Sequence, residues 1–274
     1  MTITRVYTFY LNYKGKQITL ERLIDIIHHD GIRQVLLDLG GTIVDLSPKI
    51  KDKMREHVNK LGPVSQESLE MAVHDEWDFR RKNTLEQTIV ESVDNEQKEK
   101  EYWLSFFASV LSRLEIRSER SGHILSELIR LQMAPESYEV YPFMKDLIEE
   151  LGILGIQLDI VSNAFPSAQK IFEHTGLQSK FSTVIFSHLC NHIKPKAEIY
   201  QLAIAKTNHT PDKILFIDDY EPFVNGAEKL GIQGAQICVK STRISDNHRK
   251  GKQAQVSSLA EKIQYSFPFM IVPA

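Results

Sequence analysis

The stretch QVLLDLGGTIVD, residues 34–45, constrains the fold of this chain more than any other part of the sequence. Residues 35–37 are apolar and partly β-branched, which is typical of a strand buried on both faces of a parallel sheet. The run ends at Asp38, and Gly40 and Gly41 then permit a sharp turn in which the backbone can approach a ligand. Open α/β sheets bind ligands at the carboxyl ends of their strands. The stretch therefore predicts a buried strand with a candidate functional carboxylate, although an ordinary turn would have the same local pattern.

Three later stretches place polar or basic residues in comparable positions. LDIVSNA and KILFIDDY are apolar runs that end in polar residues, and HIKPKAEIY contains a lysine and a proline just before an expected helix. The side chains of interest are Ser162, Asn163, Lys194, Asp218 and Asp219. In order and spacing, the four stretches resemble the motifs of the haloacid-dehalogenase-like (HAD) hydrolase superfamily, and the resemblance covers about residues 34–239.

The pattern of expected elements indicates how the chain is organised. Between residues 138 and 240, strands alternate with helices, which is typical of parallel βαβ units. The resemblance implies an α/β fold in which residues 34–45 and 138–240 form a Rossmann-like, doubly wound parallel sheet core. Residues 46–137 are poor in glycine and rich in charge, and by resemblance they form an inserted all-helical cap domain. Residues 1–33 would be an N-terminal extension and residues 241–274 a C-terminal tail.

Hydrophobic periodicity and capping patterns give the individual elements. The expected strands of the core cover residues 158–162, 183–187, 215–218 and 236–239. The expected helices include residues 49–61, 65–81, 142–151, 166–174, 197–207 and 223–230. Thr84 with Gln87 and Asp94 with Gln97 have the spacing of capping boxes that open further helices. Apolar stripes at residues 102–110 and 124–131 predict two helices packed against each other in a core.

The two ends of the chain carry segments beyond the core. Residues 2–13 favour a strand or hairpin arm, and residues 20–27 repeat as one face of a helix does. We expect both to pack on the core, with a homodimer or partner contact through the extensions as the alternative. Residues 240–252 predict a solvated loop, or alternatively a phosphate-binding or acidic-surface-binding segment. The apolar residues 267–274 are expected to dock against the body, or else to form an exposed interaction tail.

Composition limits the class of protein. The chain has 42% hydrophobic and 25% charged residues, which is ordinary for a soluble globular protein. A formal net charge of −3 gives no reason to expect a nucleic-acid partner. Two cysteines are too few for a disulfide framework, so we expect a reducing, cytoplasmic location. No apolar run approaches the roughly 18 residues of a membrane span, and the N-terminus has no signal-peptide-like apolar core.

The resemblance assigns the catalytic and metal-binding roles. It implies that Asp38 is the nucleophile of a phosphatase and forms an aspartyl-phosphate that water later hydrolyses. It also implies that Mg²⁺ is bound by Asp38, Asp219 and the backbone carbonyl of Gly40, with Asp218 close by. The strands that end at Asp38 and Asp218 would be neighbours in the sheet. Oxygen ligands of this kind are those that Mg²⁺ prefers.

The same resemblance implies how a small phosphorylated substrate is held. Thr42 and Ser162, with the loop amides around Gly41 and with Asn163, would contact the phosphate oxygens. Lys194 would neutralise charge and keep the carboxylates ionised. Taken alone, it could equally be a surface lysine before a helix.

One departure from the family pattern affects the chemistry directly. The common phosphatase pattern DxDxT has a second Asp as acid and base, whereas DLGGT has Gly40 in that place. General acid–base catalysis is typically worth about 10²–10⁴-fold in rate. Three interpretations remain open: an acid from the cap, a substrate whose leaving group needs no proton, or a catalytically weak or inactive binding or regulatory protein. The candidate cap acids are His74, Asp75 and Asp78.

Smaller departures and other branches of the superfamily complete the set of hypotheses. The family often has Asp at the position of Lys196 and Asn at that of Phe223, and the second difference weakens the expected support of the metal site. A haloacid dehalogenase would use the same aspartate without metal, but the pair Asp218–Asp219 favours magnesium. A phosphonatase would need a cap lysine that forms a Schiff base. The leading hypothesis is a Mg²⁺-dependent hydrolase of a phosphoric monoester.

Overall fold

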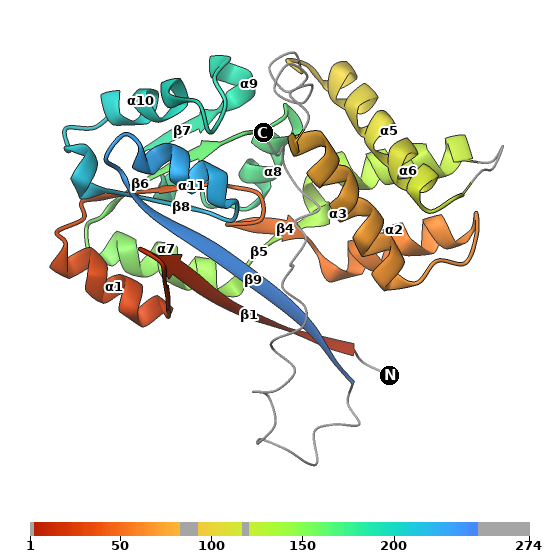
Figure 1. Ribbon diagram of the computed structural model, residues 1–274, viewed down its shortest axis with the longest axis horizontal. Coiled ribbons are helices and arrows are strands. Elements are labelled where there is room, and N and C mark those ends of the chain that lie inside the picture. Colours follow the sequence, from red (N-terminus) through yellow and green to blue (C-terminus); the bar gives the residue numbers. More distant parts are fainter. Residues whose placement is uncertain (1–2, 83–92, 117–120, 246–274) are drawn as a thin grey trace.

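The computed structural model describes residues 3–82, 93–116 and 121–245. Their central feature is a seven-stranded sheet with the order β2-β1-β9-β8-β3-β6-β7, flanked by helices on both faces (Figure 1). The strands are β1 (Ile3–Tyr13), β2 (Lys16–Ile18), β3 (Gln34–Leu37), β6 (Gln157–Ser162), β7 (Thr183–Phe186), β8 (Ile214–Asp218) and β9 (Gln233–Ser245). The five strands from β9 to β7 are parallel to their neighbours, and β1 and β2 extend the edge in antiparallel fashion. The predicted α/β fold with a doubly wound parallel core is therefore confirmed.

The alternation of side chains along the central strands explains why helices cover both faces. Leu36 and Phe216 lie in a cluster with helices α10 and α11, whereas Leu37 and Ile217 lie in a larger cluster on the other face. All four side chains are buried. Successive side chains of a strand point to opposite faces of the sheet, so a strand of apolar residues is buried only when helices cover both faces. This is why the local sequence was sufficient to predict the layered core.

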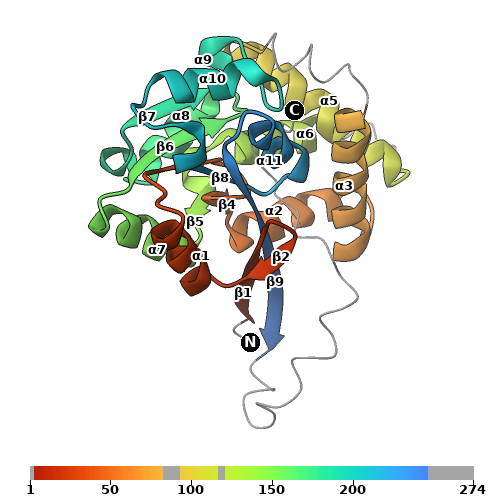
Figure 2. The same ribbon diagram turned by 60° about the vertical axis from the view of Figure 1, so that its left-hand side comes forward.

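The helices form two groups, one around the sheet and one in the insertion beside it (Figures 1 and 2). The helices of the extension and core are α1 (Leu20–His29), α7 (Pro142–Ile153), α8 (Ser167–His174), α9 (Ser187–Cys190), α10 (Ala197–Ala205) and α11 (Glu221–Glu228), with 3₁₀ turns at Pro135–Ser137, Gln178–Lys180 and Pro211–Lys213. The helices of the insertion are α2 (Pro48–Asn59), α3 (Gln66–Lys82), α5 (Glu96–Arg113) and α6 (Ser121–Met133). Most of the predicted helices are confirmed to within two or three residues at each end.

The N-terminal extension packs on the core as predicted. Strand β1 pairs with β9 along its whole length, from Ile3 opposite Ser245 to Tyr13 opposite Ala235. Leu23 and Ile27 of α1 are buried in the main hydrophobic cluster. The prediction of a loop from residue 240 was wrong for residues 240–245, which belong to β9. Their partners are residues 3–8 of β1, which lie 232–242 residues away in sequence, and local patterns do not reveal such distant partners.

A two-stranded ribbon connects the core to the helical insertion. It consists of β4 (Val44–Leu46) and β5 (Tyr138–Val140), which are antiparallel with Asp45 opposite Glu139. The Asp45 carboxylate accepts a hydrogen bond from Tyr141 Oη at 3.0 Å and pairs with the Lys51 ammonium at the start of α2. One carboxylate thus fixes the chain where it leaves the core and where it returns.

Within the insertion, the helices pack through an aromatic core. The rings of Trp77 and Phe106 lie 4.4 Å apart, and Trp103 packs edge-on against both. The apolar stripes predicted to form a core therefore do so. Helix α5 begins one residue later than expected, because Asn95 accepts hydrogen bonds from the amides of residues 97 and 98, at 3.0 and 3.1 Å. The capping box predicted at Asp94 was wrong for this reason.

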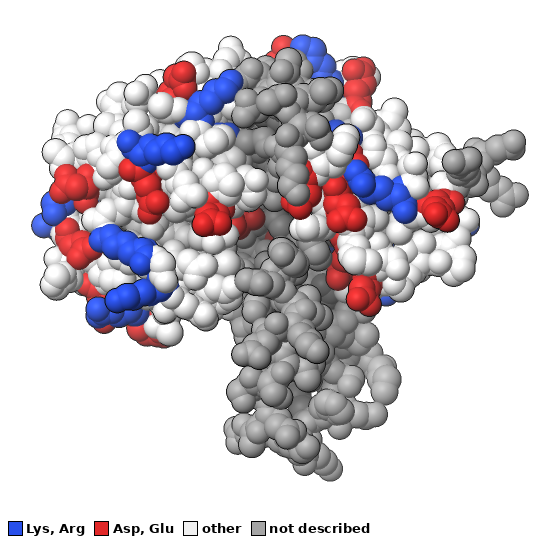
Figure 3. All heavy atoms as spheres, in the orientation of Figure 1, with Lys and Arg blue, Asp and Glu red and all other residues white. Residues whose placement is uncertain are grey.

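The described residues also bear on the expectations about membrane spans and surface charge. None of their helices combines the length and the apolar character needed to cross a bilayer. On the face drawn in Figure 3, acidic and basic side chains are interspersed over the core. The capping box at Thr84 and the segment at residues 246–274 lie outside the described residues.

Candidate functional site

The candidate site lies where two neighbouring parallel strands end. Strands β3 and β8 pair with Leu37 opposite Ile217, and the Asp38 amide donates to the Ile217 carbonyl at 3.0 Å. The predicted adjacency of the strands that lead to Asp38 and Asp218 is therefore confirmed. From β3 the chain continues to β6 and β7 on one side and returns to β8 and β9 on the other. In open sheets this reversal creates a crevice at the carboxyl ends, where ligands bind.

The Lys194 ammonium joins the two strand ends. Its Nζ lies 2.6 Å from Asp38 Oδ1 and 2.6 Å from Asp218 Oδ2. All three side chains are buried, and that of Lys194 is 1% exposed. Charge-assisted hydrogen bonds of this length are stronger than neutral ones and are screened little by salt when buried. Lys194 is therefore the counter-ion of both carboxylates rather than a surface lysine.

The pKa values of the trio reflect burial and mutual charge. Burial disfavours the charged ammonium of Lys194, but the carboxylates of Asp218 and Asp38 outweigh this effect and raise its pKa. Burial raises the pKa of Asp218 to about 6, and the charge of Asp38 adds to this rise while Lys194 opposes it. Lys194 thus remains charged at neutral pH. Asp218 takes up a proton more readily than an exposed aspartate does, mainly because it is buried.

Acidic side chains outnumber basic ones around Lys194. Oxygen atoms of Asp38, Asp218 and Asp219 lie within 4.8 Å of one another, and Asp219 is partly exposed. Three carboxylates against one ammonium leave a surplus of negative charge that a dication would compensate. Hard carboxylate oxygens are the donors that Mg²⁺ prefers. The donor set of this structure therefore fits Mg²⁺, which Asp38, Asp218 and Asp219 would hold.

The turn after Asp38 brings the predicted substrate-binding backbone over the strand end. Gly41 has φ +77°, a conformation that L side chains rarely adopt, and its amide donates to the Val44 carbonyl at 2.9 Å. Gly40 forms a bridge with the same Val44. Thr42 is fully buried, and its Oγ1 has no hydrogen-bond partner within the described structure. Buried polar atoms are normally satisfied, so Thr42 Oγ1 is an unused hydrogen-bonding group in the turn that follows Asp38.

The loop after β6 fixes the position of Lys194. Asn163 Nδ2 donates to the Lys194 carbonyl at 3.0 Å, and the Lys194 amide donates to Asn163 Oδ1 at 2.8 Å. Asn163 thus binds the backbone of the lysine, a role that the sequence did not indicate. Ser162 is also buried, and its hydroxyl lies 3.5 Å from the Asn163 carbonyl. These contacts place Asn163 beside Lys194, and Ser162 precedes it at the end of β6.

Helix α11 and the segment at Lys194–Pro195 approach each other unusually closely. A Cβ at Gly226 would lie 2.8 Å from Pro195 Cβ and 2.9 Å from the Pro195 carbonyl oxygen. Tyr200 Oη donates to the Phe223 carbonyl at 2.7 Å and ties α10 to α11. Glycine at position 226 is therefore required by packing rather than by conformation.

The two departures from the family pattern have physical counterparts. The Phe223 ring centroid lies 4.8 Å from Lys194 Nζ, so an aromatic face contacts the lysine at the position where the family often has Asn. Cation–π contacts of this kind are worth up to about 2 kcal/mol when desolvated. Lys196 occupies the N-cap position of α10 without a side-chain capping bond. An Asp in that place would cap the helix, so this difference concerns helix stability.

The helical insertion contacts the loop that follows Ser162. Glu99 of α5 is fully buried and accepts a hydrogen bond from the Ser167 amide at 2.8 Å and another from Ser167 Oγ at 2.5 Å. Trp103 Nε1 donates to the same carboxylate at 3.2 Å. The rings of Tyr102 and Phe165 pack 4.6 Å apart beside it. Glu99 therefore caps the first turn of core helix α8 from the insertion, and sequence reasoning missed it because its partner is 68 residues away.

The candidate cap acids lie together on α3. His74 Nδ1 is 3.5 Å from Asp75 and its Nε2 is 3.9 Å from Asp78, and all three side chains are partly or fully exposed. The structure thus groups them with one another on one helix.

Comparisons with known proteins agree with this arrangement. Residues 32–239 match the family model described as haloacid dehalogenase-like hydrolase. The chain is 24% identical over 218 residues to a phosphoglycolate phosphatase of Salmonella typhi, and the match covers 73% of this chain and 79% of that one.

A second relative and a solved structure extend the comparison. The pyrophosphatase PpaX of Oceanobacillus iheyensis gives a shorter match, 30% identical over 98 residues. This match covers 35% of this chain and 46% of PpaX. The crystal structure of the L-2-haloacid dehalogenase RSc1362 superimposes with a TM-score of 0.57 at 20% identity, over 74% of this chain and 85% of that one. At this identity the structural likeness concerns the fold alone.

Removal of the counter-ion tests the energetics of the trio. We expect Lys194→Met to destabilise the metal-free protein by about 3–5 kcal/mol, because two buried carboxylates lose their only described cationic partner. Adding Asp218→Asn should recover part of this loss, since one of the charges is then absent. Urea unfolding at neutral pH measures both values, with the exposed Lys180→Met as control. A double variant no more stable than Lys194→Met would contradict the electrostatic account.

Glu99 provides a pH-dependent test of the contact between insertion and core. Burial raises its pKa above the ordinary 4.5, so the folded state holds the proton more tightly than the unfolded chain. The corresponding stability is fully present below the ordinary pKa and is lost as pH rises through the raised pKa. We therefore expect the stability of Glu99→Gln to decline less with rising pH than that of the wild type, as measured by urea midpoints.

The control for this experiment is Glu96→Gln on the same helix. The hydrogen bond from Lys100 lowers the pKa of the exposed Glu96. The small contribution of Glu96 to stability is therefore lost as the pH falls, whereas that of Glu99 is lost as the pH rises. Parallel pH profiles for Glu99→Gln and the wild type would show that burial does not govern the Glu99 carboxylate.

Proposed function

This chain belongs to the haloacid dehalogenase-like hydrolase family, and we propose that it is a Mg²⁺-dependent phosphatase that acts on a small phosphorylated substrate through Asp38. The observation that carries this proposal is the Lys194 ammonium, 2.6 Å from Asp38 and from Asp218 at the ends of adjacent strands. The relative named phosphoglycolate phosphatase supports a phosphoric monoester as the substrate class.

In the first step, a carboxylate oxygen of Asp38 attacks the phosphorus atom. The bond from phosphorus to the leaving oxygen breaks, and that oxygen departs with the electron pair. Lys194 orients the Asp38 carboxylate, and its charge offsets that of the phosphoryl oxygens. Mg²⁺, when bound, adds positive charge at the same oxygens. Thr42 Oγ1, which has no partner among the described residues, would donate to one of them.

In the second step, water attacks the phosphorus of the aspartyl-phosphate, and Asp38 leaves as a carboxylate. This step normally benefits from a base that takes the proton of the water. At the place where the common pattern has that base, Gly40 has no side chain. The same absence deprives the first step of an acid for the leaving oxygen, so substrates with good leaving groups, such as aryl and acyl phosphates, would react best.

The helical insertion would act as a cap over this site. Glu99 attaches α5 to the first turn of α8, five residues beyond Ser162. A cap held there would exclude water and select the substrate. His74, Asp75 and Asp78 remain candidates for the acid that Gly40 cannot provide.

Gly40 also favours a second candidate function, that of a catalytically weak binding or regulatory protein with the same fold. The two candidates differ in turnover. A phosphatase hydrolyses an aryl phosphate when Mg²⁺ is present, whereas a binding protein would not do so at a rate above that of its Asp38→Asn variant.

We expect hydrolysis of p-nitrophenyl phosphate to depend on Mg²⁺ and to fall at least about 10³-fold in Asp38→Asn, since the amide is not a nucleophile. We also expect a burst of p-nitrophenol close to one equivalent. p-Nitrophenolate leaves without an acid, so with this substrate the missing acid–base residue mainly slows the second step, by about 10²–10⁴-fold. Stopped-flow absorbance measures both. Activity that survives Asp38→Asn would contradict the mechanism.

A further inference from the structure

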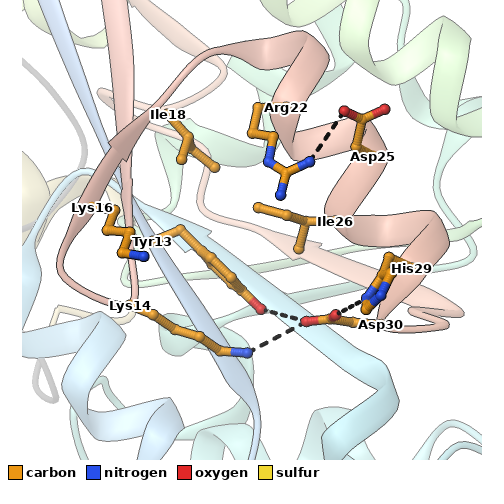
Figure 4. A pocket seen from close by; sticks show the side chains of 9 residues that line it. All are labelled: Tyr13, Lys14, Lys16, Ile18, Arg22, Asp25, Ile26, His29 and Asp30. Atoms are coloured by element: carbon orange, nitrogen blue, oxygen red, sulfur yellow. Dashed lines mark hydrogen bonds and ion pairs between the residues drawn. The ribbon is translucent and has the colours of Figure 1, made fainter.

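A cavity of about 540 Å³ lies between the β1–β2 hairpin and helix α1, outside the candidate active site (Figure 4). Helix α1 leads into the beginning of β3, whereas Asp38 follows the end of that strand. The cavity therefore lies near the amino ends of the parallel strands, whereas the carboxylate cluster lies at their carboxyl ends. We propose that it is a binding site for a small organic anion, a molecule with an apolar body and a phosphate or carboxylate group. This proposal is independent of the proposed phosphatase activity.

The charges that line the cavity favour an anion. Three basic residues, Lys14, Lys16 and Arg22, line the cavity together with two acidic residues, Asp25 and Asp30. The bases come from the hairpin and from the first turn of α1, so they approach the cavity from two sides (Figure 4). An ionised guanidinium and two ammonium groups around one cavity are the donors that phosphate and carboxylate groups require.

One of the two carboxylates is already satisfied by the protein. Asp30 lies 3.0 Å from Tyr13 Oη, 3.4 Å from Lys14 Nζ and 3.0 Å from His29 Nδ1. The hydrogen bond with His29 lowers the pKa of Asp30, and Tyr13 and Lys14 contribute in the same direction. Asp30 is therefore an ionised group with its own donors, and it does not compete for the remaining bases.

The remaining bases have little compensation. Arg22 Nη1 lies 3.4 Å from Asp25 Oδ2, and both side chains are about two-thirds exposed, at 64% and 67%. Exposed pairs of this kind contribute little. For the Lys16 side chain, the described part of the chain supplies no hydrogen-bond or ion-pair partner. An anion in the cavity could reach Lys16 and Arg22 without displacing a strong interaction.

The other side chains of the cavity explain why the ligand should have an apolar body. Ile18 of the hairpin and Ile26 of α1 face the cavity together with the Tyr13 side chain (Figure 4). Both isoleucines are partly buried. Small-molecule sites commonly have 300–1,000 Å³, with apolar walls and a few polar groups that fix the orientation. A bare inorganic ion would leave the apolar wall in contact with water.

A ligand in the cavity would contact residues that join the β1–β2 hairpin to the start of β9, so binding should stabilise this part of the sheet. Tyr13 Oη also contacts the Gln233 side chain at the start of β9, and Gln233 Nε2 donates to the Asp212 carbonyl at 2.9 Å. A ligand bound to the folded hairpin and helix stabilises the folded state by mass action. We therefore expect saturating ligand to raise the midpoint of thermal unfolding.

The test is calorimetric titration of the full-length, metal-free protein with phenylphosphonate and with benzoate, neither of which contains a phosphoric ester. Lys16→Glu and Arg22→Glu should each weaken binding at least about tenfold, as loss of a charge-assisted contact predicts. Lys180→Glu, an exposed lysine outside the cavity, should bind as the wild type does. Circular dichroism checks that each variant is folded.

The two probes and two further ligands distinguish the outcomes. Binding of phenylphosphonate alone would assign a phosphate-type group, and binding of both probes would assign an anion of either kind. Inorganic phosphate and benzyl alcohol should bind at least about tenfold more weakly, since each lacks one half of the ligand. The proposal is overturned if neither probe binds at 10 mM, if benzyl alcohol binds as well as benzoate, or if Lys16→Glu and Arg22→Glu leave the affinity unchanged.

Discussion

The interaction on which the site depends is the buried contact of Lys194 with Asp38 and Asp218. The two carboxylates follow adjacent parallel strands, so the sheet alone would bring like charges together in a medium of low polarity. Lys194 makes this arrangement tolerable, and other parts of the fold fix its position. Asn163 binds its backbone, and Gly226 leaves room for the segment that carries it. The loop after β6, the segment before α10 and helix α11 therefore meet around one ammonium group.

The charge balance of the site connects its structure to its chemistry. Asp219 adds a third carboxylate, and the surplus favours a dication at the same place. Gly40 removes the side chain that the common family pattern uses to move protons. In the proposed mechanism, such a site has a nucleophile and its electrostatic support, but it lacks acid–base assistance at that position. The expected consequence is an uneven pair of steps, with formation of the aspartyl-phosphate faster than its hydrolysis.

The sequence predicted those features that depend on local pattern or on motif resemblance. Apolar runs such as that before Asp38 predicted the buried strands, and the order of the motifs predicted that Asp38 and Asp218 would be neighbours. Features that depend on distant partners were missed or predicted wrongly. Glu99 looks like any charged residue of a helix until Ser167 is beside it, and residues 240–245 become a strand only because β1 pairs with them.

Borohydride trapping tests most directly whether Asp38 carries the phosphoryl group. The protein would be mixed with excess p-nitrophenyl phosphate and Mg²⁺, and then reduced within the steady state. Reduction of an aspartyl-phosphate gives homoserine, which peptide mass spectrometry detects as a loss of mass at one residue. Because hydrolysis of the intermediate is expected to be slow, the account predicts this change at position 38 in a large fraction of molecules. Release of p-nitrophenol without any modification of Asp38 would contradict it.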